Sequence, residues 1–183
     1  MNSVYMKIVG CMQVGGDCSW ILDSSLTNMS EIVDEIVLVG GSVSDDSKKI
    51  IEKCNKVVET NFYPDNQSRI EWDDMNSLLL MAKNHGADWI LFMDADETFE
   101  PRFKTTIRDY IDNPDAGMYK FRRYWLWNTA EQYRVDRPEK FSSLAYNSYL
   151  VRSTPALHFP NPAGSLWKRL IKHLQGKEKL RPY

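Results

Sequence analysis

The stretch that decides the fold is Ala87-Asp-Trp-Ile-Leu-Phe-Met-Asp-Ala-Asp-Glu-Thr-Phe-Glu-Pro101. Its first half, Trp89 to Met93, is an unbroken apolar run, which is typical of a strand covered on both faces in a parallel sheet. Asp94 and Asp96 follow this run at alternate positions, so both carboxylates can turn toward one point. Ligands of open parallel sheets bind at the carboxyl ends of the strands. The stretch therefore predicts a buried strand that ends at a ligand site.

Three further strand-helix units precede this strand. Strands are predicted at Lys7–Val14, Glu35–Val39 and Lys56–Thr60, and helices from Asp17 or Ser19 to Met29, over 45–54 and over 73–85. We expect Trp20, Ile21 and Leu26 on the buried side of the first helix, and loops at Gly40-Gly41 and at 61–69. With a helix from Pro101 to Ile111, the order predicts a Rossmann-like α/β/α sandwich with a mostly parallel central sheet.

The remainder of the chain has a different composition. Aromatic and arginine residues fill 117–127, which is predicted to be a strand, and further strands are expected near 133–135 and 147–152. A length of 183 residues suits one domain. We expect this domain to span 1–163, with a ligand-binding half at 1–100 and a second half at 101–163, followed by a basic amphipathic tail at 164–183.

The net charge of -2 conceals an uneven distribution. Residues 1–100 hold 7 Lys/Arg and 18 Asp/Glu, and residues 101–183 hold 16 and 7. This distribution excludes a uniformly basic nucleic-acid binder, and no nucleic-acid partner is expected. Three cysteines, none in a CxxC pair, indicate free thiols in a reducing compartment, and no targeting segment is recognised. A cytoplasmic location is expected.

Asp94 and Asp96 are predicted to hold Mn2+ or Mg2+, because hard oxygen ligands suit these ions. A bound divalent ion can grip a diphosphate and neutralise charge on a leaving group. The structural alternative is a strand-end turn whose acids are solvated or cap backbone groups. The three preceding strand-helix units favour the metal hypothesis.

The segment 87–101 resembles the DxD segment of family 2 glycosyltransferases, which have the GT-A fold. The segment 73–82, with Asn76 followed by apolar residues, is similar to the preceding helix of that family, and 7–14 and 33–39 are similar to its first two strands. The resemblance covers roughly residues 5–125. Two departures stand out. Gly16-Asp17 replaces the usual Asn-Glu, and Gly40-Gly41 replaces a usual Asp that contacts the nucleotide base.

The resemblance implies inverting transfer of a sugar from a UDP- or GDP-sugar donor to a glycan or lipid-linked acceptor, and cell-envelope or surface glycan synthesis is the expected setting. It also implies donor contacts at Val14, Asp17, Gly40, Asn76, Asp94, Ala95 and Asp96. The catalytic base is expected downstream, where Glu131 and Asp136 are the candidates and surface charges are the alternative. A late histidine, His158, is a candidate third metal ligand or a structural residue.

The tail at 164–183 combines Lys168, Arg169 and Lys172 with Leu166, Trp167 and Leu170. This pattern is typical of a helix that lies on an anionic membrane, and equally of a helix that packs on the domain with its lysines exposed. The tail therefore marks a candidate peripheral membrane contact on the inner face.

Three rival functions are weighed against the glycosyltransferase hypothesis. Asp94 to Thr98 also fits the DxDxT loop of phosphatases that resemble haloacid dehalogenases, but three strand-helix units precede it and no later Asp-Asp pair follows. The nucleotidyltransferase hypothesis lacks support, because the first strand is not followed by a glycine-rich loop with a Lys or Arg after it. Because Gly40-Gly41 replaces the usual Asp, a third hypothesis stays open, namely a catalytically impaired binding protein of the same fold.

Overall fold

The computed structural model describes residues 5–64, 71–124, 126–127, 129–133 and 149–159. In chain order the elements are β1 (Ile8–Gly15), α1 (Ser19–Ser30), β2 (Glu35–Gly41), α2 (Asp45–Lys53), β3 (Val57–Tyr63), α3 (Glu71–Asn84), β4 (Trp89–Phe92), α4 (Phe103–Ile111), β5 (Met118–Lys120), β6 (Leu126–Trp127), β7 (Thr129–Tyr133) and β8 (Tyr149–Arg152).

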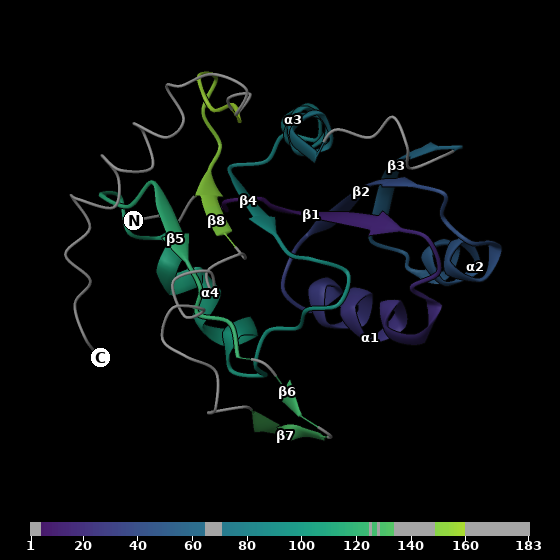
Figure 1. Ribbon diagram of the computed structural model, residues 1–183. Coiled ribbons are helices and arrows are strands. Elements are labelled where there is room, and N and C mark those ends of the chain that lie inside the picture. The colour runs from purple at the N-terminus through teal and green to yellow at the C-terminus, as the bar shows by residue number, and fades with distance from the viewer. Residues whose placement is uncertain (1–4, 65–70, 125, 128, 134–148, 160–183) are drawn as a thin grey trace, which may run out of the picture.

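Six strands form the central sheet in the order β3-β2-β1-β4-β8-β5 (Figure 1). The first four strands in this order are parallel to one another, and β8 is antiparallel to both β4 and β5. The predicted α/β class and mostly parallel sheet are confirmed. The order also brings β1 and β4 together at the centre, where the residues that follow both strands share one edge.

Helices cover both faces of the sheet (Figure 1). Side chains of α1, α2 and α4 pack on one face, and α3 packs on the other together with Leu157 and Phe159. Strands buried on both faces explain the apolar runs of β2 and β4, whose residues from Ile36 to Val39 and from Trp89 to Phe92 are all buried. The core is therefore two apolar layers separated by the sheet.

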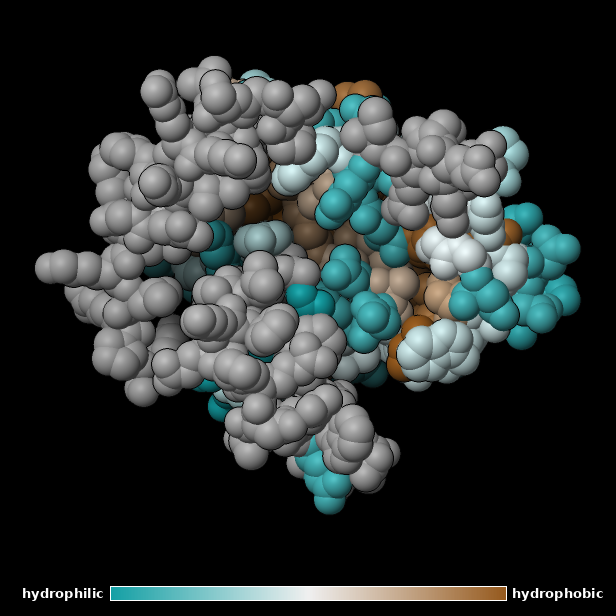
Figure 2. Space-filling model, viewed as in Figure 1, coloured by the Kyte–Doolittle hydropathy of each residue, from teal (hydrophilic) through white to brown (hydrophobic). Residues whose placement is uncertain are grey.

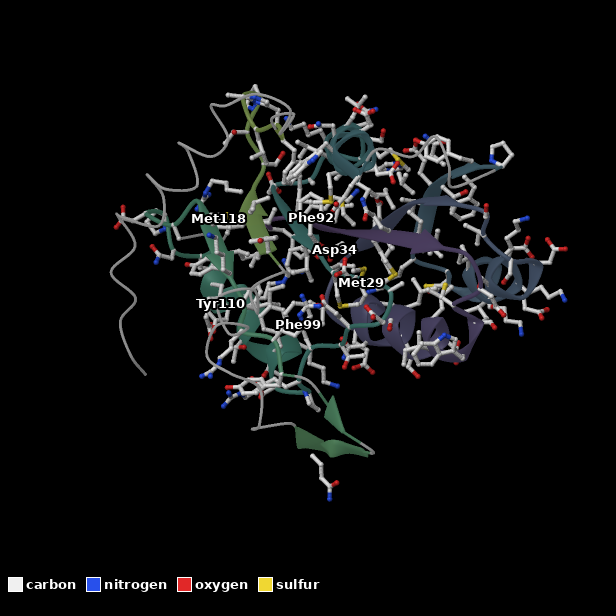
Figure 3. All side chains as sticks on the ribbon, viewed as in Figure 1. Met29, Asp34, Phe92, Phe99, Tyr110 and Met118 are labelled. Carbon is white, nitrogen blue, oxygen red and sulfur yellow. The ribbon has the colours of Figure 1, made fainter. Side chains whose placement is uncertain are left out.

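The first strand and α1 approach very closely. A Cβ atom on Gly10 would lie 2.6 Å from the sulfur of Met29, which packs between α1 and β1 (Figure 3). Leu22 and Leu26 are also buried on this helix. The expectation that Trp20 is buried is wrong, since its side chain is 77% exposed. Leu22 and Met29 occupy the inner face instead.

Two expected boundaries also differ. Gly40 and Gly41 do not break the chain into a loop but remain in β2, where Gly40 pairs with Val14 and Gly41 with Gly15. The third strand continues through Tyr63, because β2 extends to Gly41 and offers it a partner. Hydrogen bonding along neighbouring strands thus outweighs the local preference of glycine for turns.

The aromatic stretch 117–127 is not one strand. Its described part divides into β5, residues 121–124 without regular structure, and β6, which pairs with β7 as a separate two-stranded ribbon. Tyr119 and Phe121 turn inward and pack against Tyr110, while Phe121 also contacts Phe99 at 5.2 Å between ring centroids. Phe99 and Tyr110 lie on the α4 side of the sheet (Figure 3). These aromatic residues are therefore part of the core.

Candidate functional site

The candidate site lies where β1 and β4 end side by side. The N–H of Met93 donates to the carbonyl of Cys11 at 3.1 Å, so pairing with β1 continues one residue beyond β4 and holds the start of the acidic loop at this edge. A cleft of about 330 Å³ opens here, near the lower end of the range for ligand sites. Its lining residues are Gln13, Gly15, Cys18, Trp20, Ile21, Asp94, Ala95 and Asp96.

The space-filling view shows hydrophilic and hydrophobic side chains exposed together in the middle of this face (Figure 2). Such a mixture suits a ligand with a polar part and an apolar part, because each part finds a matching surface. The cleft brings together three of the residues predicted to bind the donor, namely Asp94, Ala95 and Asp96.

The acidic loop is a tight turn held by Glu97. The N–H of Glu97 donates to the carbonyl of Asp94 at 3.1 Å, and the N–H of Asp94 donates to Oε2 of Glu97 at 3.3 Å. Glu97 is further paired with Arg123, whose Nη1 lies 3.0 Å from Oε1 of the glutamate. The loop is thus anchored to the segment after β5 through a largely buried ion pair, which the sequence analysis did not anticipate.

The electrostatics of the site centre on Asp94. Burial raises the pKa of its carboxyl to about 6, and the neighbouring charges of Glu97, Asp96 and Glu71 also raise it, while Arg123 opposes them. Asp96 is exposed at the mouth of the cleft. Negative charge is therefore in local excess around Asp94, which is the condition that a bound cation relieves.

The carboxylate ligands at this site fit a magnesium or manganese ion in number and charge. Such ions are held by one or two carboxylates together with substrate phosphates and water, and Asp94 and Asp96 supply two carboxylates with excess negative charge around them. Across the part of the chain that the structure describes, no three carboxylate, imidazole or thiol groups converge to hold a metal ion. A cation here would need further oxygen ligands from its substrate or from solvent.

The expected donor contacts at the end of β2 are restricted by close packing. A Cβ atom on Gly40 would lie 2.0 Å from the carbonyl oxygen of Val14, so no side chain fits at this position. The side chain of Val14 is fully buried in the core. These two residues present only backbone atoms at this edge.

Asp17 lies in the turn between β1 and α1. Its Oδ1 accepts three hydrogen bonds, from the N–H of Ser19 at 3.1 Å, from Oγ of Ser19 at 2.7 Å and from Oγ of Ser44 at 3.1 Å. These bonds lower the pKa of the Asp17 carboxyl, the Ser19 hydroxyl contributing most. The carboxylate joins the start of α1 to the residue that caps α2. Oδ1 is thus directed at the protein itself.

Asn76 and His158 lie together on the α3 side of the sheet. The amide of Asn76 donates to the carbonyl of Phe159 at 2.9 Å and accepts from its N–H at 2.9 Å, so it clamps this segment to α3. His158 is exposed, with Nδ1 3.0 Å from the carbonyl of Ala156. The described contacts of both residues are with backbone groups rather than with Asp94 or Asp96.

Of the two candidate bases, Glu131 has its backbone in β7 and its side chain lies outside the described residues, as does all of Asp136. The tail at 164–183 also lies outside them. Sequence reasoning missed Gln13 and Trp20, which line the cleft. The position of Gln13 directly before the end of the first strand is a signal that could have identified it.

The fold, with its parallel βα units and an antiparallel strand inserted beside β4, is of the Rossmann-like GT-A type. Scans against protein-family models and curated proteins give no match. Among solved structures, the TarS 1-349 fragment from S. aureus matches with a TM-score of 0.60 at 17% identity, over 90% of this chain and 53% of that one. TarS 1-349 in complex with UDP-GlcNAc matches with a TM-score of 0.53 at 19% identity, over 74% of this chain and 38% of that one.

Two other enzymes have the same fold. Mannosyl-3-phosphoglycerate synthase from Rubrobacter xylanophilus matches with a TM-score of 0.52 at 13% identity, over 80% of this chain and 54% of that one. A CMP:2-keto-3-deoxy-manno-octonic acid synthetase with bound CTP matches with a TM-score of 0.50 at 12% identity, over 92% of this chain and 86% of that one. The chain spans about half the length of the TarS fragment. At these low identities the TM-scores show a shared fold and nothing beyond it.

Proposed function

We propose that this chain carries the donor-binding domain of a metal-dependent glycosyltransferase. The observation that carries the proposal is the placement of Asp94 and Asp96 on a cleft at the carboxyl ends of β1 and β4. Structures of the same fold include one in complex with UDP-GlcNAc. The reaction is transfer of a sugar from a UDP- or GDP-sugar to an acceptor hydroxyl with inversion, as the resemblance to family 2 implies.

In this proposal Asp94 and Asp96 hold Mn2+ or Mg2+, with the donor diphosphate and solvent supplying further oxygens. His158, the third ligand expected from the sequence, does not converge with the two carboxylates in this structure, so it would have to move to reach the ion. The ion would neutralise the charge that develops on the leaving diphosphate. Glu97 and Arg123 keep the acidic turn in place, so that both carboxylates are positioned before the donor arrives. The backbone of Val14 and Gly40 and the side chains of Asp17 and Asn76 remain donor-contact candidates by resemblance.

The acceptor side is assigned to residues 101–163. Glu131 or Asp136 would remove the proton from the attacking hydroxyl, since transfer with inversion needs a general base on the face opposite the leaving group. A glycan or lipid-linked acceptor, in cell-envelope or surface glycan synthesis, completes the proposal.

The proposal is tested by thermal unfolding of the full chain with a panel of nucleotide sugars and Mn2+. At least one UDP- or GDP-sugar should raise the melting temperature, because a ligand that binds only the folded state stabilises it. Asp96→Ala should remove this shift, whereas Asp45→Ala, an exposed carboxylate on α2, should retain it. Absence of any shift across the panel would refute the proposal.

A second candidate function is nucleotidyl transfer, because the CTP-bound synthetase is covered over 86% of its length. The two functions differ in product. A nucleotidyltransferase joins the nucleotide of a nucleoside triphosphate to a sugar and releases pyrophosphate. A glycosyltransferase transfers the sugar of a nucleotide sugar and releases a nucleoside diphosphate. Assays of both products with the same protein preparation decide between them.

The basic tail at 164–183 is proposed to touch an anionic membrane from the cytoplasmic side. Within the described part of the chain, no helix has the length and apolar character needed to cross a membrane. Deletion of 165–183 should abolish sedimentation with anionic vesicles, and unchanged sedimentation would refute this contact.

A further inference from the structure

The side chain of Trp20 is exposed where the fold does not require it. It lies in the first turn of α1, is 77% exposed and lines the cleft that also contains Asp94 and Asp96. The same helix already buries Leu22, Leu26 and Met29 against the sheet. An aromatic ring left in water on the wall of a cleft is available to a ligand, and indole offers a large flat apolar surface.

The strand ends beside Trp20 carry no side chains. Gly15 and Gly16 end β1 and begin the following turn, and Gly40 and Gly41 end β2. Gly15 pairs with Gly41 in the sheet, and the 2.0 Å separation between a Cβ atom on Gly40 and the carbonyl oxygen of Val14 leaves no room for a side chain. This edge therefore offers a ligand backbone atoms, and it is open at Gly16, where a Cβ atom would meet nothing within 4 Å.

Several polar side-chain atoms near this edge already bind other parts of the protein. Nε2 of Gln13 donates to the carbonyl of Glu71 at 3.4 Å, and Oδ1 of Asp17 accepts its three hydrogen bonds from Ser19 and Ser44. Cys18 lies 3.6 Å from Oγ of Ser47 through its sulfur. Among the described residues, the largest surface available to a planar ring at this end of the cleft is the indole of Trp20.

We propose that Trp20 is the stacking platform for the nucleobase of the donor, and that the chain recognises this base by its face rather than by its hydrogen-bonding edge. The inference rests on the proposed function, because it assigns the base end of the same cleft. A base stacked on Trp20 places the attached diphosphate toward Asp94 and Asp96, which line the same cleft.

Recognition by stacking has a consequence for selectivity. Every base has an aromatic face, so stacking tolerates different bases, whereas a site built to hydrogen-bond one edge rejects analogues by several orders of magnitude. UDP, CDP and GDP should therefore bind within about tenfold of one another. Affinity should depend on Trp20 for all three.

The test measures binding of UDP, CDP, GDP and inorganic pyrophosphate to the full chain in the presence of Mn2+, by calorimetry. Trp20→Ala should weaken the affinity for UDP and GDP by about tenfold. The affinity for pyrophosphate should stay within about twofold of the wild-type value, since pyrophosphate has no base. Trp20→Phe should retain most of the affinity. Leu80→Ala, which removes another exposed apolar side chain, on the surface of α3, should behave as wild type.

Three outcomes overturn the inference while leaving the proposed function intact. They are unchanged nucleotide affinity in Trp20→Ala, an equal loss for pyrophosphate, and discrimination among the three nucleotides of more than about a hundredfold. If neither pyrophosphate nor any nucleotide binds wild type, the proposed function itself fails.

Discussion

Acidic residues have opposite environments at the two edges of the central sheet, where the strands begin and where they end. At the amino-terminal edge, Glu35 is paired with Lys7 at 2.8 Å and with His85 at 3.2 Å, and His85 also contacts Glu59 at 3.0 Å. At the carboxyl-terminal edge, burial raises the pKa of Asp94, and the negative charges of Glu97, Asp96 and Glu71 raise it further against the opposing charge of Arg123. One edge stabilises the fold, and the other retains unfavourable charge that a cation can relieve.

The same contrast appears in hydrogen bonding to the backbone. Asp34 accepts from the N–H of Ile8 at 2.7 Å and Asp88 from the N–H of Lys7 at 2.7 Å, so both carboxylates fix the start of β1. Asp96, by contrast, is exposed at the cleft. Acids that satisfy the protein and acids that are available to a ligand are thus separated by the length of the strands.

The largest expected effect on stability is at Gly40. Gly40→Ala places a methyl group 2.0 Å from the carbonyl oxygen of Val14, and neither backbone can move without breaking the pairing of β1 with β2. We expect a loss of more than about 3 kcal/mol in the free energy of unfolding, measured by urea denaturation. Gly117→Ala, where a Cβ meets nothing within 4 Å, is the matched control. A loss below about 1 kcal/mol at Gly40 would show that the strand ends are not closely packed.

The next effect concerns Asp94 and separates stability from function. Because the folded-state pKa is raised to about 6, the unfolded chain ionises first as pH rises, and ionisation of the folded carboxyl costs up to about 3 kcal/mol above pH 6. Asp94→Asn should therefore be more stable than wild type at pH 7, and the difference should vanish near pH 3. Urea denaturation at the two pH values measures it.

Mn2+ provides a control for this interpretation. If Asp94 helps to hold the ion, saturating Mn2+ should stabilise wild type and have a smaller effect on Asp94→Asn, because a ligand carboxylate is missing. A stability difference that is the same at both pH values would contradict the assigned cause, since it would then reflect packing rather than ionisation.

The sequence was sufficient to predict most of the fold. The apolar runs of β2 and β4 and the alternation of strands and helices predicted a parallel α/β sheet, and the strand order confirms that class. The position of Asp94 and Asp96 after a buried strand also predicted their place at the cleft. These features are local, so a single sequence contains them.

Features that depend on distant partners could not be predicted in this way. Trp20 was expected on the buried side of α1, but the face that carries Leu22 and Met29 packs on the sheet instead, and the strands beneath the helix decide which face is covered. Likewise, Glu97 and Arg123 are 26 positions apart, and no periodicity connects them. Pairing of this kind follows from the tertiary fold.

The ion pair between Glu97 and Arg123 should have an intermediate effect. Arg123→Ala leaves a largely buried carboxylate without this partner beside Asp94, and we expect a loss of about 2 kcal/mol in the free energy of unfolding. Glu97→Gln removes the charge while retaining an oxygen that can accept from the N–H of Asp94. The double variant should be more stable than the sum of the two single losses predicts. Additive losses in this cycle would show that the pair does not couple.

The smallest of these effects lies at the opposite edge, where Arg108 joins α4 to the start of β1. Its Nη1 donates to the carbonyl of Met6 at 2.6 Å and its Nη2 to Asp34 at 3.2 Å. Because the side chain is 38% exposed, solvent screening weakens the ion pair, and Arg108→Ala should cost about 1 kcal/mol. Donor affinity should remain unchanged, because this edge contributes nothing to the cleft. A weaker affinity for UDP in Arg108→Ala would contradict the view that one edge of the sheet stabilises the fold and the other binds the ligand.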